Sequence, residues 1–335
     1  MAVDLGIVIT PAEVQCEGLD VVLDNVQLRA GTGHVDTTLG VYEPAADGRG
    51  RREPPLDVIG HVRVLDRPLW GRRELYLRSY LPSPPEPDVY ADLPYPRPLV
   101  APSHLRVDVS RRIVDACRRR GLGVSIQISS YTLPSLPGGQ SAEQTEGSRV
   151  GGDRPVRVDG SVADGVLAGH GCLNNPNVRA LGLARLRDAL RRYPNVDALY
   201  LDWAEYTCYF LEDCFTCFCE RCRIATGSDS YEWDRIVRDC HALRDRLHRL
   251  DPVGLRLLAS PASHSTLLLG WLERAPAALD LPRLKAETVT SAVAEIRAEM
   301  NALGLSRVAL GMDGFPPPWS LVTGMHPSVV EGYAT

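Results

Sequence analysis

Five cysteines lie close together in a cysteine-rich loop between residues 207 and 230. They are Cys208, Cys214, Cys217, Cys219 and Cys222. Thiolates at C-x2-C-x-C-x2-C spacing suit a tetrahedral zinc ion, with Zn–S bonds of about 2.3 Å. The spacing therefore predicts a closed, structural zinc site, formed by the last three of these cysteines with Cys214 or Cys208 as the fourth ligand. The alternative is a set of reduced thiols packed under the loop, or a disulfide formed after purification.

Two carboxylates lie directly in front of this loop. The apolar run 198–201 predicts a buried parallel strand that ends at Asp202, and Glu205 follows three residues later. Asp313 comes directly after the last strand that we expect. Because the carboxyl ends of such strands face the ligand in α/β proteins, these three residues are candidate catalytic groups. Turn formation is the structural alternative for both aspartates.

Composition excludes several classes of function. The chain has 335 residues, a net charge of −5 and mixed acidic and basic residues, which argues against a nucleic-acid or membrane partner. Lys285 is the only lysine, so Schiff-base and pyridoxal chemistry are disfavoured and no organic cofactor is expected. The first residues do not resemble a signal peptide, and no apolar run reaches the length of a membrane span, which predicts a cytoplasmic protein.

Apolar runs and amphipathic segments alternate along the chain. We expect strands at residues 5–10, 34–42, 124–130, 198–201, 254–260 and 307–312, and helices at 19–30, 107–120, 177–193, 231–250, 265–274 and 283–302. This alternation predicts an α/β fold with a parallel sheet, arranged as one (β/α)8 TIM-barrel-like domain over residues 1–335.

Two regions depart from a regular barrel. Residues 43–102 form a proline-rich insertion in which segments 61–65 and 74–80 could pair as a hairpin, serving as a lid, a partner surface or a self-packed excursion. At the C-terminus the sequence ends too soon after Asp313 for two further βα units. Strands of the insertion could complete the sheet, the barrel could be incomplete, or a second copy of the chain could supply the missing wall.

One stretch resembles a known family. The stretch consists of N-N-P-N-V-R at 174–179, a helix, and V-D-A-L-Y-L-D-W at 196–203. It is similar to glycoside-hydrolase-like (β/α)8 barrel proteins. Ala198 and Leu199 stand in place of the usual glycine and isoleucine. The cysteines at 217–222 resemble the zinc cluster of some β-galactosidases. The resemblance, which covers Cys172 to Arg223, implies that Asp202 is the fourth-strand catalytic carboxylate. Glycoside cleavage also requires a protonated carboxyl group, for which Glu205 and Asp313 are candidates.

Further polar and aromatic residues are expected near the same strand ends, where they could bind the hydroxyl groups of a carbohydrate or another polyol. They are His34, Asp36, Gln127, His170, Asn174, Trp203 and Trp319. The sequence thus predicts a glycoside hydrolase, retaining or inverting, with a carbohydrate substrate. The alternative is a catalytically inactive barrel that binds carbohydrate or a protein, and a homo-oligomer is compatible with either. Metal-dependent hydrolysis at the cysteine loop is a weaker reading, because an all-sulfur site has no open position for water.

Overall fold

The computed structural model describes residues 5–44, 76–134, 151–163, 169–227 and 231–326. The chain divides into two compact units. The sheet unit comprises Met1–Ser130, Leu183–Asp202 and Met300–Gly311, and the cysteine unit comprises Tyr131–Gly182, Trp203–Glu299 and Met312–Thr335. No described helix combines the length and the apolar character that crossing a membrane requires.

The main sheet has the strand order β1-β2-β5-β6-β7 among the described residues. Its strands are β1 (Gly6–Ile9), β2 (His34–Thr38), β5 (Gly123–Ser129), β6 (Ala198–Asp202) and β7 (Ala309–Asp313). The pairings of β1 with β2, β2 with β5 and β5 with β6 are parallel. The predicted α/β fold with a parallel sheet is therefore confirmed. The sheet is open rather than closed into a barrel.

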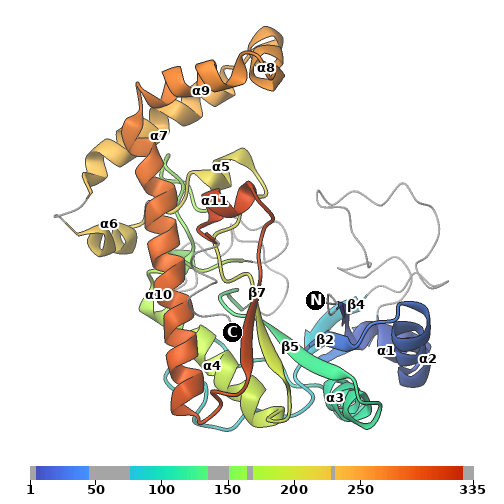
Figure 1. The fold of residues 1–335 in the computed structure, drawn as a ribbon. Helices are drawn as coiled ribbons and strands as arrows, with labels where there is room; N and C mark the ends of the chain where they lie inside the picture. The colour runs from blue at the N-terminus through green and yellow to red at the C-terminus, as the bar shows by residue number, and fades with distance from the viewer. Residues whose placement is uncertain (1–4, 45–75, 135–150, 164–168, 228–230, 327–335) are drawn as a thin grey trace. The chain divides into compact units, whose positions relative to one another are not determined.

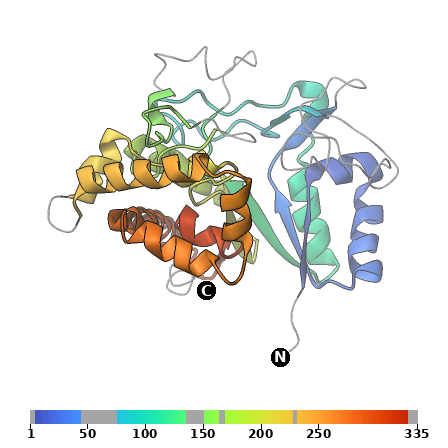
Figure 2. The ribbon, with the colours of Figure 1, turned by 90° about the horizontal axis from the view of Figure 1, so that it is seen from above.

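The sheet unit includes the helices α1 (Pro11–Glu17), α2 (Leu19–Asp24) and α3 (Val109–Arg119) and the π-helix η1 (Asn25–Arg29). Asp108 caps α3, because its side chain accepts a hydrogen bond from the Arg111 amide at 2.9 Å. The buried face of α3 includes Ile113 and Cys117, and the helix contacts β2 and β5 (Figure 1 and Figure 2). A periodic apolar stripe in the sequence thus covers the central strands.

Strand β4 (Tyr76–Tyr80) lies inside the proline-rich insertion, as predicted for segment 74–80. Its partner is β3 (Val41–Pro44), with which it pairs antiparallel. The segment 61–65, which we expected to pair with it, lies outside the described residues. A short 3-10 helix, η3 (Ser103–Leu105), then leads to α3.

The cysteine unit is mostly helical among its described residues. Its elements are η5 (Gly151–Asp153), the start of α4 (Pro176–Arg192), α5 (Leu211–Cys214), α6 (Glu220–Thr226), α7 (Trp233–His248), α8 (Pro252–Ala259), α9 (His264–Leu272), η6 (Pro276–Leu279), most of α10 (Asp280–Ala302) and α11 (Trp319–Thr323). Part of its core lies between α7 and η6, where Ile236 and Cys240 pack against Ala277.

The predicted strand at 254–260 is wrong, because this segment belongs to helix α8. Asp251 caps the helix by accepting a hydrogen bond from the Gly254 amide at 2.7 Å, and Pro252 occupies the first turn. Both features favour the start of a helix. The apolar run that we took for a buried strand is largely exposed, since α8 contains no buried residue.

Candidate metal centre and carboxylate site

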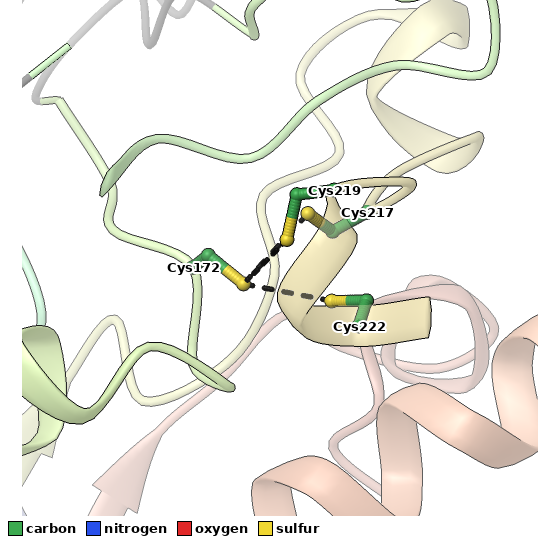
Figure 3. Close-up of side chains that lie close together, drawn as sticks. All are labelled: Cys172, Cys217, Cys219 and Cys222. Carbon is green, nitrogen blue, oxygen red and sulfur yellow. Dashed lines mark hydrogen bonds between the residues drawn. The ribbon is translucent and has the colours of Figure 1, made fainter. Parts of the chain in front are cut away.

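Four cysteines of the cysteine unit converge on one point. The Sγ atoms of Cys172, Cys217, Cys219 and Cys222 all lie within 4.8 Å of one another (Figure 3). Cys172 Sγ is 3.5 Å from the sulfur atoms of both Cys219 and Cys222 and 3.8 Å from that of Cys217. In a tetrahedral site with Zn–S bonds of about 2.3 Å, sulfur atoms are about 3.8 Å apart. The four side chains therefore fit around a single metal ion.

Two donors from neighbouring segments point at these sulfur atoms. The Val156 amide lies 3.3 Å from Cys217 Sγ, and Asn174 Nδ2 lies 3.4 Å from Cys222 Sγ. Asn174 Nδ2 also donates to Thr288 Oγ1 at 3.2 Å. Such outer hydrogen bonds orient metal ligands and stabilise thiolate charge. Asn174, which the sequence suggested as a sugar ligand, thus lies beside the cysteine cluster.

The four thiols differ in their acidity. Burial raises the pKa of the Cys217 thiol, whereas hydrogen bonds from the other three thiols lower the pKa of Cys219. Without a cation, further thiolates in this cluster would repel the first. A bound cation removes this repulsion and favours deprotonation of all four ligands.

The fourth sulfur is not the one expected from spacing. Cys172 precedes α4 in the chain and reaches the other three, whereas Cys214 ends α5 with its sulfur 3.9 Å from the Phe210 carbonyl oxygen. Cys208, the other expected ligand, is also outside the cluster of four. A usable sequence signal was that Cys172 lies two residues before the start of the N-N-P-N-V-R motif.

Glu205 is a buried carboxyl group with a perturbed pKa. It is 2% exposed, and its oxygens accept hydrogen bonds from the Phe315 amide and the Thr323 hydroxyl. Burial raises the pKa of Glu205 to about 7, although both hydrogen bonds act in the opposite direction. At neutral pH this carboxyl group therefore retains its proton in a large fraction of molecules.

Aromatic rings lie near this carboxyl group. The Tyr209 ring is 5.7 Å from that of Trp203 and 5.3 Å from that of Phe315, the residue whose amide binds Glu205. Trp203 adopts a φ of 60°, which is uncommon for a bulky residue. Its carbonyl oxygen is 2.8 Å from Nε2 of the buried His170, whose pKa is lowered by burial. Neutral His170 thus donates this bond and holds the turn after β6.

Asp202 and Asp313 have the positions expected from the sequence. Asp202 is the last residue of β6, and the Ser129 hydroxyl lies 3.4 Å from its Oδ2. Asp313 is the last residue of β7. Asp202 belongs to the sheet unit, and Asp313 belongs with Glu205 to the cysteine unit.

The remaining predicted sugar ligands are dispersed. His34 begins β2, in register with the first residue of β5, whereas Asp202 is in register with the last residue of that strand. This spacing places His34 about 20 Å along the sheet from Asp202. Ser125 bonds both His34 Nε2, at 3.0 Å, and Asp36 Oδ1, at 2.8 Å. Gln127 lies further along β5.

Trp319 and Lys285 are two further side chains of the cysteine unit. Trp319 begins α11 and is 53% exposed. Lys285 is 2% exposed, and its Nζ donates to the carbonyl oxygens of Cys214, at 3.0 Å, and Val322, at 2.8 Å. Nζ also lies 5.5 Å from the centre of the Tyr206 ring, and burial lowers the pKa of Lys285 to about 8. Lys285 thus joins α10 to two other segments.

No protein-family model and no curated protein matches this sequence. Similar solved structures include the β-galactosidase of the psychrophilic Marinomonas ef1, with 14% identity and a TM-score of 0.46 over 92% of this chain and 37% of that one. The β-galactosidase of the Antarctic haloarchaeon Halorubrum lacusprofundi has 15% identity and a TM-score of 0.46 over 99% of this chain and 39% of that one. Another is the cold-adapted β-galactosidase of Rahnella sp. R3, with 13% identity and a TM-score of 0.44 over 92% of this chain and 35% of that one. The chain spans less than two fifths of the length of these proteins, so its function has to be inferred from its own residues.

Proposed function

We propose that this protein is a glycoside-hydrolase-like enzyme in which Glu205 is the proton donor. The environment of the Glu205 carboxyl carries the proposal: it is buried, bound by two donors, close to aromatic residues, and has a pKa raised to about 7. Cleavage of a glycosidic bond needs a carboxylic acid that keeps its proton near neutral pH. The aromatic rings of Trp203 and Tyr209 suit the apolar faces of a sugar.

The winding of the sheet supports an incomplete (β/α)8-type barrel. The five strands found among the described residues follow one another in chain order, so each new strand is added on the same side of the sheet. In β/α barrels the strands are laid down in this way, whereas doubly wound sheets reverse direction at a switch point.

Zinc is the ion that we propose for the four-cysteine site. Four thiolates match its preference for sulfur and for tetrahedral geometry, and a site closed by four protein ligands is structural. The ion would tie the segment before α4 to the loop that contains Cys217 and Cys219. It takes no part in the reaction that we propose.

The proposed reaction adds one water molecule across a glycosidic bond. Glu205 gives its proton to the departing oxygen as the bond from carbon to oxygen breaks. In a retaining course, the second carboxylate attacks the anomeric carbon, and Glu205 regains its proton from the water that then displaces this carboxylate. In an inverting course, the second carboxylate takes a proton from the attacking water, and exchange with solvent returns a proton to Glu205. Asp202, three residues before Glu205 in the chain, and Asp313, two residues before Phe315, are the candidates.

A carbohydrate- or protein-binding protein without activity is the second candidate function. One observation favours it: both oxygens of Glu205 already accept hydrogen bonds within the protein, and the side chain is 2% exposed. A proton donor of a glycosidase must reach the substrate oxygen during the reaction.

Aryl glycosides with good and poor leaving groups test the proposal. Glu205→Gln should lower turnover by about 10²–10⁴-fold for poor leaving groups and less for good ones, since these need little protonation. A variant of the second carboxylate, Asp202→Asn or Asp313→Asn, should lose turnover on both kinds of substrate. The exposed Glu273→Gln serves as the matched control.

Thermal unfolding of each variant would establish that it is folded. Wild-type turnover should decline as the pH rises through about 7, when Glu205 loses its proton. Unchanged turnover in Glu205→Gln would remove this residue from the mechanism. Absence of hydrolysis by the wild-type protein on a broad glycoside panel would favour the binding function.

A further inference from the structure

A pocket of about 260 Å³ lies in the cysteine unit, next to the metal centre. Cys217 and Cys222 contribute to its wall, together with residues of α6 and α10. Its volume greatly exceeds the roughly 10–15 Å³ that one water molecule needs. The pocket is therefore more than the space between the four sulfur atoms, and Glu205 does not line it.

We infer that this pocket binds an uncharged, hydroxyl-rich molecule about the size of a monosaccharide. This binding site is additional to the proposed catalytic carboxyl groups and does not depend on that function. Three properties of the lining lead to this inference: the state of its charges, the number of its polar groups and its aromatic faces.

The charged side chains of the pocket lining, two cations and the carboxylate of Glu287, are already engaged. Glu287 Oε1 accepts a hydrogen bond from the Tyr231 hydroxyl at 2.7 Å. Arg179 Nη1 lies 2.6 Å from Glu295 Oε1 and 2.9 Å from Ser291 Oγ. Lys285 donates to two backbone carbonyl oxygens. An anionic ligand would have to displace these partners, which makes an anion a poor fit.

The uncharged polar groups suit hydroxyl groups. Asn174, Thr226, Thr288 and Ser291 line the pocket, and the Asn174 amide nitrogen is directed at Cys222 Sγ and Thr288 Oγ1. A purely apolar ligand would take these side chains out of water without replacing their hydrogen bonds. A molecule with several hydroxyl groups can both donate to and accept from them.

Two aromatic side chains add apolar surface to the same lining. Tyr206 is 2% exposed and lies over Lys285 Nζ, and the Trp233 ring lies 5.5 Å from that of Phe218. These contacts restrict the movement of both rings. A combination of aromatic faces with a few placed polar groups is typical of small-molecule sites, and it suits the carbon–hydrogen face of a sugar ring or an inositol.

Fluorine NMR of fluorotryptophan-labelled protein tests the inference directly. Titration with D-glucose, D-galactose, D-mannose and myo-inositol should shift the Trp233 resonance saturably for at least one of them. Assignment of this resonance among the five tryptophans comes from Trp233→Phe. An unmoved Trp233 signal with every member of this panel would overturn the inference.

A pair of variants on α6 locates the binding. Ala225 is exposed and lines the pocket, whereas its neighbour Ile224 is 67% exposed and does not. Ala225→Phe fills the pocket and should weaken binding by about tenfold or more, the loss expected when a ligand forfeits one or two hydrogen bonds. Ile224→Phe places the same phenylalanine side chain outside the pocket and should bind like the wild type. Equal binding by both variants would contradict the assignment.

A second readout uses the metal centre. In cobalt-substituted protein, the sulfur-to-cobalt charge-transfer band should shift when the ligand binds, because Asn174 contacts both the pocket and Cys222 Sγ. Glu205→Gln should leave this binding unchanged. Loss of binding in Glu205→Gln but not in Ala225→Phe would place the ligand at the carboxyl group instead.

Discussion

The sheet unit and the cysteine unit have different interiors. In the sheet unit the strands bury apolar side chains such as Val124, Ile126 and Leu199, each 0% exposed. The interior of the cysteine unit includes Glu205, Lys285 and a cluster of four thiols, with helices of four to nine residues around parts of it. The first interior is stabilised mainly by removing apolar surface from water, and the second depends on paired polar groups and on an ion.

This difference predicts that the two units respond to different perturbations. Apolar burial changes little with pH or with a chelator, whereas thiolate ligation and buried ionisable groups depend on both.

Removal of the metal ion should selectively destabilise the cysteine unit. Structural zinc contributes about 10–16 kcal/mol in small zinc peptides, and we expect several kcal/mol here. A chelator or Cys219→Ser should abolish amide protection in the loop at 217–222 and at the start of α4, while β2 and β5 keep theirs. Hydrogen exchange by mass spectrometry measures both in one experiment.

Cys214→Ser is the matched control, because Cys214 is not among the four clustered cysteines. Elemental analysis should give one zinc ion per chain for this control and for the wild type. A metal-free wild-type protein with full protection would show that the thiols are packed without an ion.

Truncation in the sheet core should act independently of metal. Leu199→Ala removes a fully buried side chain from β6 and should lower the free energy of unfolding by about 2–5 kcal/mol. Denaturant unfolding with and without a chelator should give the same loss. If Leu199→Ala no longer lowered the free energy of unfolding after chelation, the stability of the sheet core would depend on the metal ion.

Glu205 should make stability dependent on pH between 4.5 and about 7. Its pKa is raised in the folded protein, so the folded state binds the proton more tightly than the unfolded chain does. Stability from this group is complete below 4.5 and declines by about 1.4 kcal/mol per pH unit, roughly 3 kcal/mol in all, as the pH rises through the folded pKa. Glu205→Gln should remove this decline, and Glu273→Gln should keep it. Chemical unfolding at several pH values provides the measurement.

The smallest effect concerns the surface of the sheet unit. Arg118 Nη2 lies 2.8 Å from Asp197 Oδ1, and both side chains are more than 40% exposed. Arg118→Met should therefore lower the free energy of unfolding by about 0.2–1 kcal/mol, and by less at high salt. A larger loss would indicate that the Arg118 bond to the Asn195 carbonyl oxygen, at 2.9 Å, matters more than the ion pair.

The same comparison explains what the sequence could predict. Strand β5 and helix α3 were identified because their apolar residues recur with the period of the element, and β6 because it is a short apolar run. The run at 254–260 has no such period, and its capping residues Asp251 and Pro252 were the decisive signal. The sequence pattern therefore predicted the type of element where the apolar residues are buried. It failed at 254–260, where the apolar residues are largely exposed.

In the candidate site, closely spaced residues could be found and distant ones could not. Three of the four clustered cysteines lie within six residues of chain, whereas Cys172 joins them from far upstream through the tertiary fold. His34 was grouped with residues at the carboxyl ends of the strands, although it begins both the predicted strand and β2. The raised pKa of Glu205 results from its burial in the folded protein, and its two hydrogen-bond donors, Phe315 and Thr323, are over a hundred residues away in the chain.

The burial of Lys285 has a practical consequence for labelling. Since this residue carries the only lysine amine in the sequence, an amine-directed reagent applied to the native protein should modify the α-amino group alone. A second adduct would form only when the region around α10 opens. The rate at which that adduct appears in intact-mass spectra would thus report the rate at which the cysteine unit opens, without any engineered probe.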